Sequence, residues 1–171
     1  MNMAVPKPAT HDAYCQGMRR LASGVTVIAS SHEGERAGLT ATAVCSVTAD
    51  PPRLLVCVNR GVYAHDVIVR SGKLSVNVLS TDQEEIAKRF AGMVKGVSGA
   101  DRFSDDEWGQ TPAGMPYVRN APVAFECSVT EAGEMGTHSM FLCDVTDVVL
   151  GQNSGDPLVY FDGCFASVSK R

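Results

Sequence analysis

The sequence predicts a mainly β fold, in which antiparallel strands close into a barrel that carries two flanking helices. Three observations support this prediction: apolar and polar residues alternate over short runs, turn residues separate these runs, and only two segments carry clear helix-capping signals. The chain of 171 residues fits a single domain. We expect this domain to span residues 11–171, after a flexible tail at residues 1–10.

Composition and charge exclude several classes of partner. The chain is 44% apolar and 20% charged, and its net charge of −4 comes with no long basic run, which argues against binding to nucleic acid. No apolar run approaches the ~20 residues that a membrane helix needs, and residues 1–10 lack the apolar core of a signal peptide. We therefore expect a cytoplasmic protein that binds neither nucleic acid nor membranes.

The cysteines are even in number, which would allow disulfides, but no Cys-x-x-Cys pair occurs. Most of them lie in apolar strand patterns, where a free thiol packs as a small hydrophobic group. We expect six buried or partly buried free thiols, and no metal site, because clustered Cys/His spacing is absent. The cysteines are Cys15, Cys45, Cys57, Cys127, Cys143 and Cys164.

The N-terminal part of the domain is predicted to hold a helix and a strand. Asp12 is expected to cap a helix that runs to about Ala22 and stops before Gly24. Val25–Ser30 is the first expected strand, and a polar hairpin loop at residues 32–36 follows it.

Residues 38–60 are predicted to form two strands joined by a stiff turn at Asp50-Pro51-Pro52, because proline supplies no N–H to a ladder. The first strand alternates from Leu39 to Val44, and Leu54–Val58 is an apolar run typical of a strand covered on both faces. Side chains at positions 40–46 are small and rich in hydroxyls. Either they face a crowded interior, or they let a flat ligand approach the backbone closely.

The middle of the chain carries the second helix. A short helical or irregular segment to Ser71 and a strand at residues 74–78 precede it. Thr81 and Glu84 form a predicted capping box for a helix that ends at Gly92, with Ile86 and Phe90 inward and Glu84 paired with Lys88. The Gly- and Asp-rich loop at residues 93–116 is long enough to be functional or a subunit contact.

The last third is predicted to be strands again. Residues 123–130 alternate between two faces, residues 133–136 form a turn, and residues 139–150 form one long strand. After a turn at residues 152–156, a hairpin closes around Asp162-Gly163, with strands at residues 158–161 and 165–168.

Three common enzyme signatures are missing. The sequence has no G-x-S-x-G elbow, no phosphate-binding G-x-x-x-x-G-K-[ST] loop and no G-x-G-x-x-G that opens a helix after a strand. The absence of these motifs is compatible with a flavin enzyme. In such an enzyme the cofactor supplies the reactive atoms, and the protein mainly holds the flavin and nicotinamide rings face to face.

Residues 40–48, followed by Pro51-Pro52 and a strand that ends Cys57-Val58-Asn59, resemble the signature of the short-chain flavin reductases. These are the reductase components of two-component flavin monooxygenases, such as the 4-hydroxyphenylacetate, chlorophenol and nitrilotriacetate monooxygenases. The resemblance covers the chain from the first helix to Val168. It implies a split β-barrel and a single flavin reductase-like domain. It also implies NADH- or NADPH-dependent reduction of FAD or FMN, and transfer of the reduced flavin to a separate oxygenase of aromatic degradation.

The resemblance also implies which residues hold the flavin. Backbone groups at residues 40–46 and 57–59 would meet the polar edge of the ring, and hydroxyl groups would meet the ribityl chain. The residues expected to contact the flavin are Thr26, Thr40, Ala41, Thr42, Ala43, Cys45, Ser46, Cys57, Val58, Asn59, Arg60, Arg89, Phe90, Ala91 and Tyr160.

The flavin phosphate needs donors or positive charge. By resemblance, Arg89 contacts it; the alternative is a solvated helix face, which we expect for Lys88. Many relatives have Ser or Thr just after the Asn59 position, where these residues contact the phosphate. This chain has Val62-Tyr63-Ala64 there instead, so Arg60 is a candidate donor to the phosphate in their place.

Gly136-Thr137-His138 resembles the motif that places the family's histidine beside the nicotinamide, so His138 is the expected catalytic residue; the alternative is a histidine at a strand end. Tyr160 lies in the closing hairpin near the site, although taken alone it would belong to the core. Cys45 is expected to pack beside the flavin rather than to act as a redox thiol, since nothing electropositive surrounds it.

Two alternatives remain open. The chain could hold FMN tightly and reduce another acceptor such as a corrinoid, or it could be a flavin-binding module without turnover. A barrel of this size leaves a flat flavin half exposed. We therefore expect a homodimer whose interface includes residues 93–116.

Overall fold

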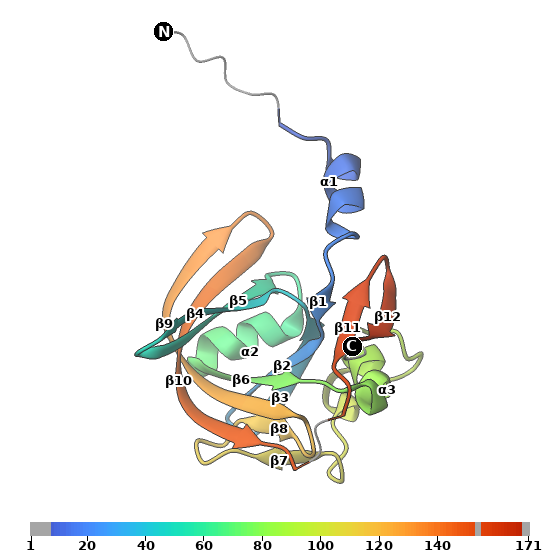
Figure 1. Cartoon of the computed structure of the whole chain (residues 1–171). Helices are drawn as coiled ribbons and strands as arrows, with labels where there is room; N and C mark the ends of the chain where they lie inside the picture. The colour runs from blue at the N-terminus through green and yellow to red at the C-terminus, as the bar shows by residue number, and fades with distance from the viewer. Residues whose placement is uncertain (1–7, 153–154, 169–171) are drawn as a thin grey trace, which may run out of the picture.

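The computed structural model describes residues 8–152 and 155–168, and antiparallel strands are their main secondary structure, as predicted (Figure 1). The largest sheet has seven strands in the order β3-β2-β6-β9-β10-β5-β4. Its strands are β2 (Thr26–His32), β3 (Glu35–Ala41), β4 (Val44–Ala49), β5 (Pro52–Asn59), β6 (Lys73–Val78), β9 (Val123–Met135) and β10 (His138–Leu150).

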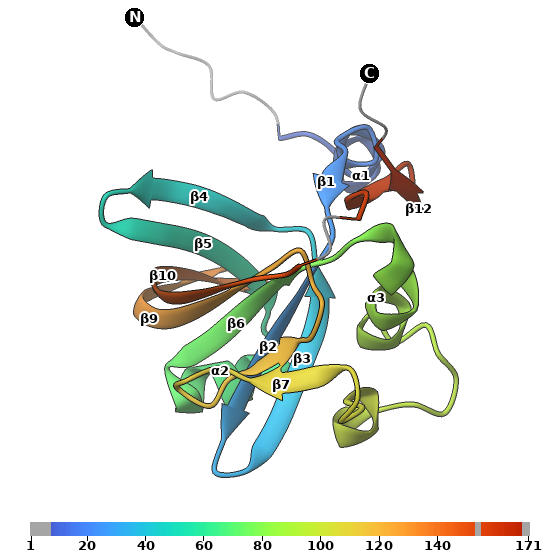
Figure 2. The same ribbon diagram turned by 60° about the horizontal axis from the view of Figure 1, so that its bottom comes forward.

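The seven-stranded sheet curls until its two edges meet. The edge strands β3 and β4 are consecutive in the chain, and only Thr42 and Ala43 separate them. Three peptide steps span at most about 11 Å, so the two edges must approach each other here. The Cys57 N–H donates to the Ala43 carbonyl at 3.0 Å. The edge hairpins then diverge from this corner (Figure 2), which makes the barrel split rather than closed.

This corner corrects the predicted single strand from Leu39 to Val44, because the chain leaves one sheet edge and joins the other. A second correction concerns the strand now called β5. Val56 and Val58 are fully buried, but Leu54, Leu55 and Cys57 are only half-buried, so the strand is not covered on both faces. Alternation and apolar runs predict strands but not which sheet edge a strand occupies.

One apolar core fills the curled sheet. Ile28, Val56, Leu74 and Phe141 pack together, and Ile68 of α2 (Tyr63–Ser71) closes the cluster. The α2 helix is the expected segment before Ser71, and it ends at Gly72 in the left-handed conformation (φ 65°). This core fixes β5, and with it the backbone that leads to Asn59.

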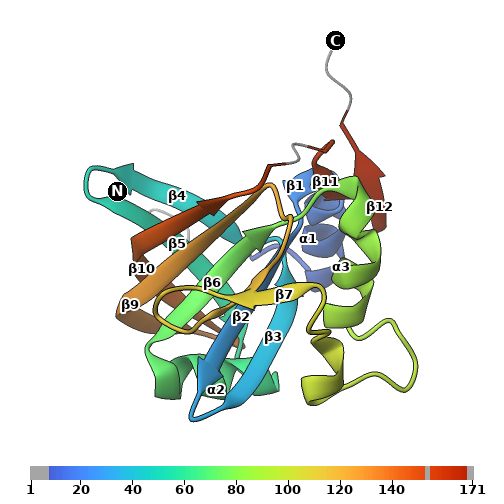
Figure 3. The ribbon, with the colours of Figure 1, turned by 90° about the horizontal axis from the view of Figure 1, so that it is seen from below.

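A second core lies beside β3, away from the β4–β5 hairpin (Figure 3). There α3 (Glu84–Phe90) packs against β11, and the rings of Phe90, Phe103 and Trp108 contact one another with centroids 4.7–5.0 Å apart. Residues 93–116 therefore fold back onto their own domain. The small elements around this core are β1 (Ser23–Gly24), η2 (Gly99–Arg102), β7 (Trp108–Gln110), β8 (Pro116–Val118), β11 (Leu158–Phe161) and β12 (Cys164–Ser167).

Both predicted helix caps are displaced towards the N-terminus. The cap of α1 (His11–Met18) is Thr10, whose hydroxyl accepts from the Ala13 N–H at 3.3 Å, and the helix stops four residues before Ala22. The capping box uses Ser80 and Gln83, with a 3-10 turn, η1 (Thr81–Gln83), before α3. In both places a residue one or two positions earlier in the chain can also cap a helix, which explains both errors.

Other boundaries differ by a few residues. The expected loop at residues 32–36 is a tight turn at Glu33-Gly34, and the expected turn at residues 133–136 is reduced to Gly136-Thr137. The closing hairpin around Asp162-Gly163 and the Glu84–Lys88 pair at 2.9 Å are confirmed. The prediction of an N-terminal tail falls largely on residues 1–7, which lie outside the described residues.

All six cysteines are free thiols, but only Cys127 and Cys143 are buried and Cys57 is half-buried. The prediction that all six are at least partly buried is wrong for Cys15, Cys45 and Cys164, which are exposed. Within residues 8–152 and 155–168, no helix is both long enough and apolar enough to cross a membrane.

Candidate functional site

The meeting point of the two sheet edges exposes a group of small residues, which we call the shelf: Thr42, Ala43, Cys45 and Ser46. All four are exposed to solvent. Their side chains are short, so a planar ligand could lie against the backbone here. The sequence predicted these residues as part of one strand, whereas the structure presents them at the corner between β3 and β4.

Asn59 of β5 and His138 of β10 are directly paired, and β5 is joined to the shelf by the bond from the Cys57 N–H to the Ala43 carbonyl. The Asn59 Oδ1 accepts from the Gly61 N–H at 2.8 Å, and this bond shapes the turn into α2. The His138 Nδ1 lies 2.9 Å from the Thr137 Oγ1, and the imidazole is exposed. A hollow of about 510 Å³ beside this pair is lined by Asn59, Gly61, Thr137 and other residues.

Arg60 lines the same hollow, but its guanidinium contacts the Glu134 carboxylate at 2.8 Å. Half of its side chain remains covered, and its charge is already balanced. The neighbouring His65 Nε2 lies 2.9 Å from the Ser139 Oγ, which anchors the start of α2 to β10. Arg60 is therefore a poorer phosphate ligand than the sequence suggested.

Two further hollows lie along the C-terminal half of β3 and meet at Ala91. The smaller, of about 180 Å³, is lined by Thr40, Ala41, Thr42 and Tyr160, among others. The Tyr160 ring packs edge-on against Phe165 at 5.4 Å. The structure thus brings Tyr160 and Ala91 to the shelf, although they lie about 120 and 50 residues away from it in the sequence.

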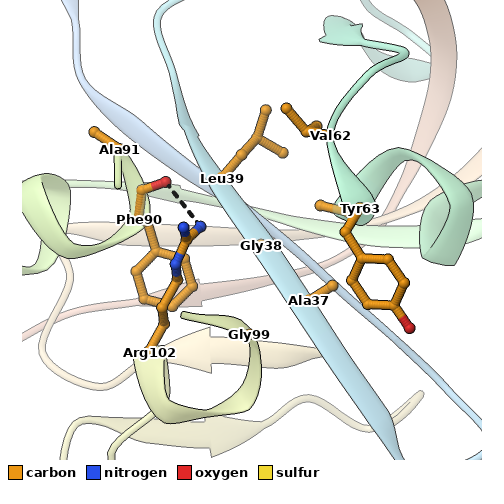
Figure 4. Close-up of a pocket in the computed structure, with 10 residues that line it drawn as sticks. Ala37, Gly38, Leu39, Val62, Tyr63, Phe90, Ala91, Gly99 and Arg102 are labelled. Carbon is orange, nitrogen blue, oxygen red and sulfur yellow. Dashed lines mark hydrogen bonds between the residues drawn. The ribbon is translucent and has the colours of Figure 1, made fainter. Parts of the chain in front are cut away.

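The larger hollow, of about 320 Å³, continues from Ala91 past Gly38 and Leu39 to the start of α2 (Figure 4). The guanidinium of Arg102 enters it from η2, on the opposite side of β3 from Tyr63 (Figure 4). Neither Gly38 nor Arg102 was predicted to take part in the site. The only signal for Arg102 was its position in a long loop between two elements.

Three of the predicted contact residues lie behind the surface. Thr26 is 6% exposed, Val58 is fully buried and Phe90 is 2% exposed, so they form the wall of the site. The Thr26 hydroxyl donates to the Ala41 carbonyl at 2.7 Å, and the Thr40 hydroxyl donates to the Ala87 carbonyl at 2.6 Å. These bonds fix β3 against its neighbours and leave both hydroxyls able to act only as acceptors.

The basic residues of α3 are held by carboxylates. Arg89 forms an ion pair with Glu107, and Lys88 lies 2.7 Å from Glu85 and 2.9 Å from Glu84. The Glu85 and Glu84 carboxylates raise the pKa of Lys88 above its usual range. Lys88 is on the solvated face of the helix, as expected, and Arg89 has a protein partner for its charge.

The thiols near the shelf lack the setting of a nucleophile. Burial, and then the neighbouring Cys45, raises the pKa of the Cys57 thiol above its usual value. A raised pKa keeps the thiol protonated at neutral pH, whereas reactive cysteines have a lowered one. Among the described residues, no group of three or more His, Cys, Asp and Glu side chains is placed to hold a metal ion.

Comparison with known proteins gives a consistent result. Residues 18–169 match the family model described as a flavin reductase-like domain. The FMN reductase (NADH) RutF of Stutzerimonas stutzeri is 39% identical over 154 residues, which are 90% of this chain and 86% of that protein. The 4-hydroxyphenylacetate 3-monooxygenase reductase component of Pseudomonas aeruginosa is 42% identical over 154 residues, covering 90% and 89%.

The fold comparison agrees. BorF, the flavin reductase component of a bacterial two-component tryptophan halogenase, superposes with a TM-score of 0.84 and 28% identity. The match covers 95% of this chain and 100% of that one. The similarity therefore extends over nearly the whole chain.

Proposed function

Because this chain belongs to the family of flavin reductase-like domains, we propose that it uses NADH to reduce FAD or FMN and releases the reduced flavin to a separate monooxygenase. The observation that carries this proposal is the shelf, an exposed corner of small residues, together with the two hollows beside β3 and the paired residues Asn59 and His138 at the ends of neighbouring strands. A bound flavin supplies the ring that accepts the hydride, so the protein must mainly bind and orient.

The residues present fit a flavin. The shelf offers an exposed surface of short side chains, and the two hollows that meet at Ala91 could hold an extended chain and the charged group at its end. Arg102 in the second hollow has a buried Nε with no hydrogen-bond partner among the described residues. A flavin nucleotide has this sequence of parts, namely a planar ring, a hydroxylated chain and a phosphate.

Each part of the site then has a role. Thr42, Ala43, Cys45 and Ser46 admit the ring because their side chains are short, and backbone groups orient its polar edge. Tyr160 and Ala91 line the path of the ribityl chain. His138, exposed and paired with Asn59, hydrogen-bonds the dinucleotide and holds its nicotinamide over the shelf.

The test is a panel of two flavins against two nicotinamides. Purified protein with FAD or FMN should oxidise NADH, or NADPH, at a rate that rises with flavin concentration. Background consumption with both flavins would rule the proposal out. Gel filtration separates the alternatives, because a substrate flavin dissociates, whereas a prosthetic FMN that serves another acceptor, such as a corrinoid, stays bound. Flavin binding without turnover would indicate a non-catalytic module.

We also propose that the reduced flavin is transferred to a separate oxygenase. It follows the relatives that are reductase components of two-component enzymes. Reduced flavin that dissociates should reduce ferricytochrome c across a dialysis membrane. If the acceptor is reduced only when mixed with the reductase, the flavin is not released.

We also propose a homodimer. The α1 helix buries none of its residues, and Tyr14, Met18 and Leu21 are 45–62% exposed. Together with Phe161 they line a groove that reaches Thr42 of the shelf. Since Phe103 and Trp108 pack into their own core, α1 is better placed than residues 93–116 to supply the apolar contact.

Sedimentation at micromolar concentration should therefore give a dimer, and Leu21→Asp should weaken it. Val69→Asp, at a residue that is 58% exposed on α2, is the matched control. A monomeric unmodified protein would contradict the proposal.

We further place the protein in the cytoplasm, because its six free thiols suit a reducing compartment.

A further inference from the structure

We propose that Asp66 makes this protein specific for NADH over NADPH, because its carboxylate lines the hollow next to His138. The two nucleotides differ only in the phosphate that NADPH carries on the 2′-hydroxyl of its adenosine ribose. The inference rests on the proposed function and adds a residue that selects between the two hydride donors. No role was predicted for Asp66 from the sequence.

The hollow, of about 510 Å³, lies where the turn after β5 meets the turn between β9 and β10. Arg60, Gly61, Gly136 and Thr137 contribute to its lining, and the Arg60 N–H donates to the Thr137 carbonyl at 2.9 Å. The Thr137 Oγ1 also lies 2.9 Å from the His138 Nδ1. A nucleotide that is held by His138 therefore has this hollow beside it, and the volume is within the roughly 300–1,000 Å³ of ligand pockets.

Both basic side chains that line the hollow have a carboxylate beside them. The Arg60 guanidinium lies 2.8 Å from the Glu134 carboxylate, and the His65 Nδ1 lies 3.4 Å from the Asp66 Oδ1. The other ring nitrogen of His65 lies 2.9 Å from the Ser139 Oγ. With the imidazole neutral, one positive and two negative charges remain, so these groups are net negative. Among the described residues that line the hollow, a phosphate finds no unopposed cation.

The Asp66 carboxylate is within reach of a ligand. It lies in the first turn of α2, and its side chain is 70% exposed. An ionised carboxylate only accepts hydrogen bonds, so a ribose hydroxyl is a suitable partner for it. A 2′-phosphate offers no hydroxyl there and adds negative charge, which Asp66 repels over a screening length of about 8 Å. The pyrophosphate is common to both nucleotides and does not contribute to the difference.

The experiment compares NADH with NADPH as hydride donors. Values of kcat/KM for both nucleotides are measured at saturating FMN in the full-length protein and in Asp66→Asn and Asp66→Arg. Asp106→Asn is the matched control, because it removes the same charge at an exposed residue that lines none of the hollows described above. Circular dichroism and thermal melts verify that the variants fold.

The unmodified protein should prefer NADH about tenfold or more. Asp66→Asn should raise kcat/KM for NADPH about fivefold or more and change the value for NADH less than about threefold, because the repulsion acts only on the 2′-phosphate. Asp66→Arg should favour NADPH further, since a guanidinium pairs with phosphate. Asp106→Asn should match the unmodified protein. Added salt should weaken the preference of the unmodified protein more than that of Asp66→Asn.

Equal use of the two nucleotides by the unmodified protein would overturn the inference, and so would equal changes for both nucleotides in Asp66→Asn. Failure of the proposed function is a different result, in which neither nucleotide is oxidised above the rate without flavin. Isothermal titration calorimetry with NAD⁺ and NADP⁺ then tests Asp66 by itself. Tighter binding of NAD⁺ that Asp66→Asn abolishes supports its role, and equal or undetectable binding of both nucleotides refutes it.

Discussion

His138 lies directly opposite Asn59 where β10 pairs with β5, so two motifs about 80 residues apart in the chain lie side by side in the sheet. The Arg60 N–H donates to the Thr137 carbonyl at 2.9 Å and holds the two turns together. This pairing gives the imidazole a fixed place beside the last residue of the flavin-like signature. The geometry suits a residue that positions a second ligand over the shelf.

Replacement of His138 by Ala should impair the use of NADH more than the binding of flavin. The loss of one hydrogen bond to the dinucleotide should raise the KM for NADH by about three- to tenfold, whereas the flavin dissociation constant should change less than twofold. Steady-state kinetics and flavin fluorescence titration measure the two effects separately.

His32→Ala is the control, because His32 lies beside the turn between β2 and β3 and lines none of the hollows described above. It should leave both constants unchanged. An equal loss of NADH use and flavin binding in His138→Ala would refute the positioning role of His138.

Much of the fold could be predicted from the sequence, because alternation and turn residues are local signals. The strands β6, β10 and β11 and the resemblance carried by residues 40–59 are confirmed. The corner at Thr42-Ala43 could not be predicted in this way. Whether a run of small residues continues one strand or joins two sheet edges depends on how the whole sheet curls.

The candidate site, like the fold, was predictable from the sequence only where local motifs define it. The shelf residues and His138 came from motifs, but the ion pairs that hold Arg60 and Arg89 involve Glu134 and Glu107, and no local pattern links them. Arg102 stood in a loop without periodicity, so its entry into the hollow beside Gly38 becomes visible only in three dimensions. The motifs indicate the class of ligand, whereas only the tertiary contacts show that Arg60 and Arg89 are already paired with carboxylates.

The accessibility of the thiols provides a test of where the flavin lies. Cys45 and Cys164 are both exposed, but only Cys45 belongs to the shelf. Saturating FMN should slow alkylation of Cys45 several-fold and leave Cys164 unaffected, as measured by mass spectrometry of the labelled peptides. If Cys45 reacts equally fast with and without FMN, the ring does not lie on the shelf.

The buried thiols supply an internal control in the same experiment. Burial and the nearby Asp144 raise the pKa of Cys143 to about 12, and burial raises that of Cys127 above its usual range. Both should remain unlabelled at neutral pH until the protein is unfolded.

Gly38 allows the close approach of Phe90 to β3. A Cβ added at Gly38 would lie 2.8 Å from the Phe90 Cε1 and 3.0 Å from the Ile28 carbonyl oxygen. Gly38→Ala must push the ring out of the aromatic cluster, so we expect a loss of about 1–3 kcal/mol in the free energy of unfolding. Urea denaturation measures the loss. Gly24→Ala has nothing within 4 Å of the added methyl and should be nearly neutral, and equal stability of both variants would contradict the packing argument.

Glu126 couples stability to pH from within the sheet. It is 5% exposed, and its carboxylate accepts from the Ala113 N–H and the Thr146 hydroxyl, both at 2.9 Å. Burial opposes ionisation, but these bonds, one from Thr111 and the charge of Lys73 outweigh it, and the pKa of Glu126 lies below its ordinary value of 4.5. The ionised form is therefore more favourable in the folded protein than in the unfolded chain.

The sign of the pH effect follows from this lowered pKa. The contribution of Glu126 to stability is complete above the unfolded value of about 4.3 and is lost as the pH falls through the lower folded value. Glu126→Gln should cost about 1–3 kcal/mol at neutral pH, and the difference from the unmodified protein should shrink towards acid pH. Urea denaturation at a series of pH values measures it, with Glu131→Gln as the exposed control on the same strand. Two parallel stability curves would show that the carboxylate of Glu126 has the same pKa in the folded and unfolded states.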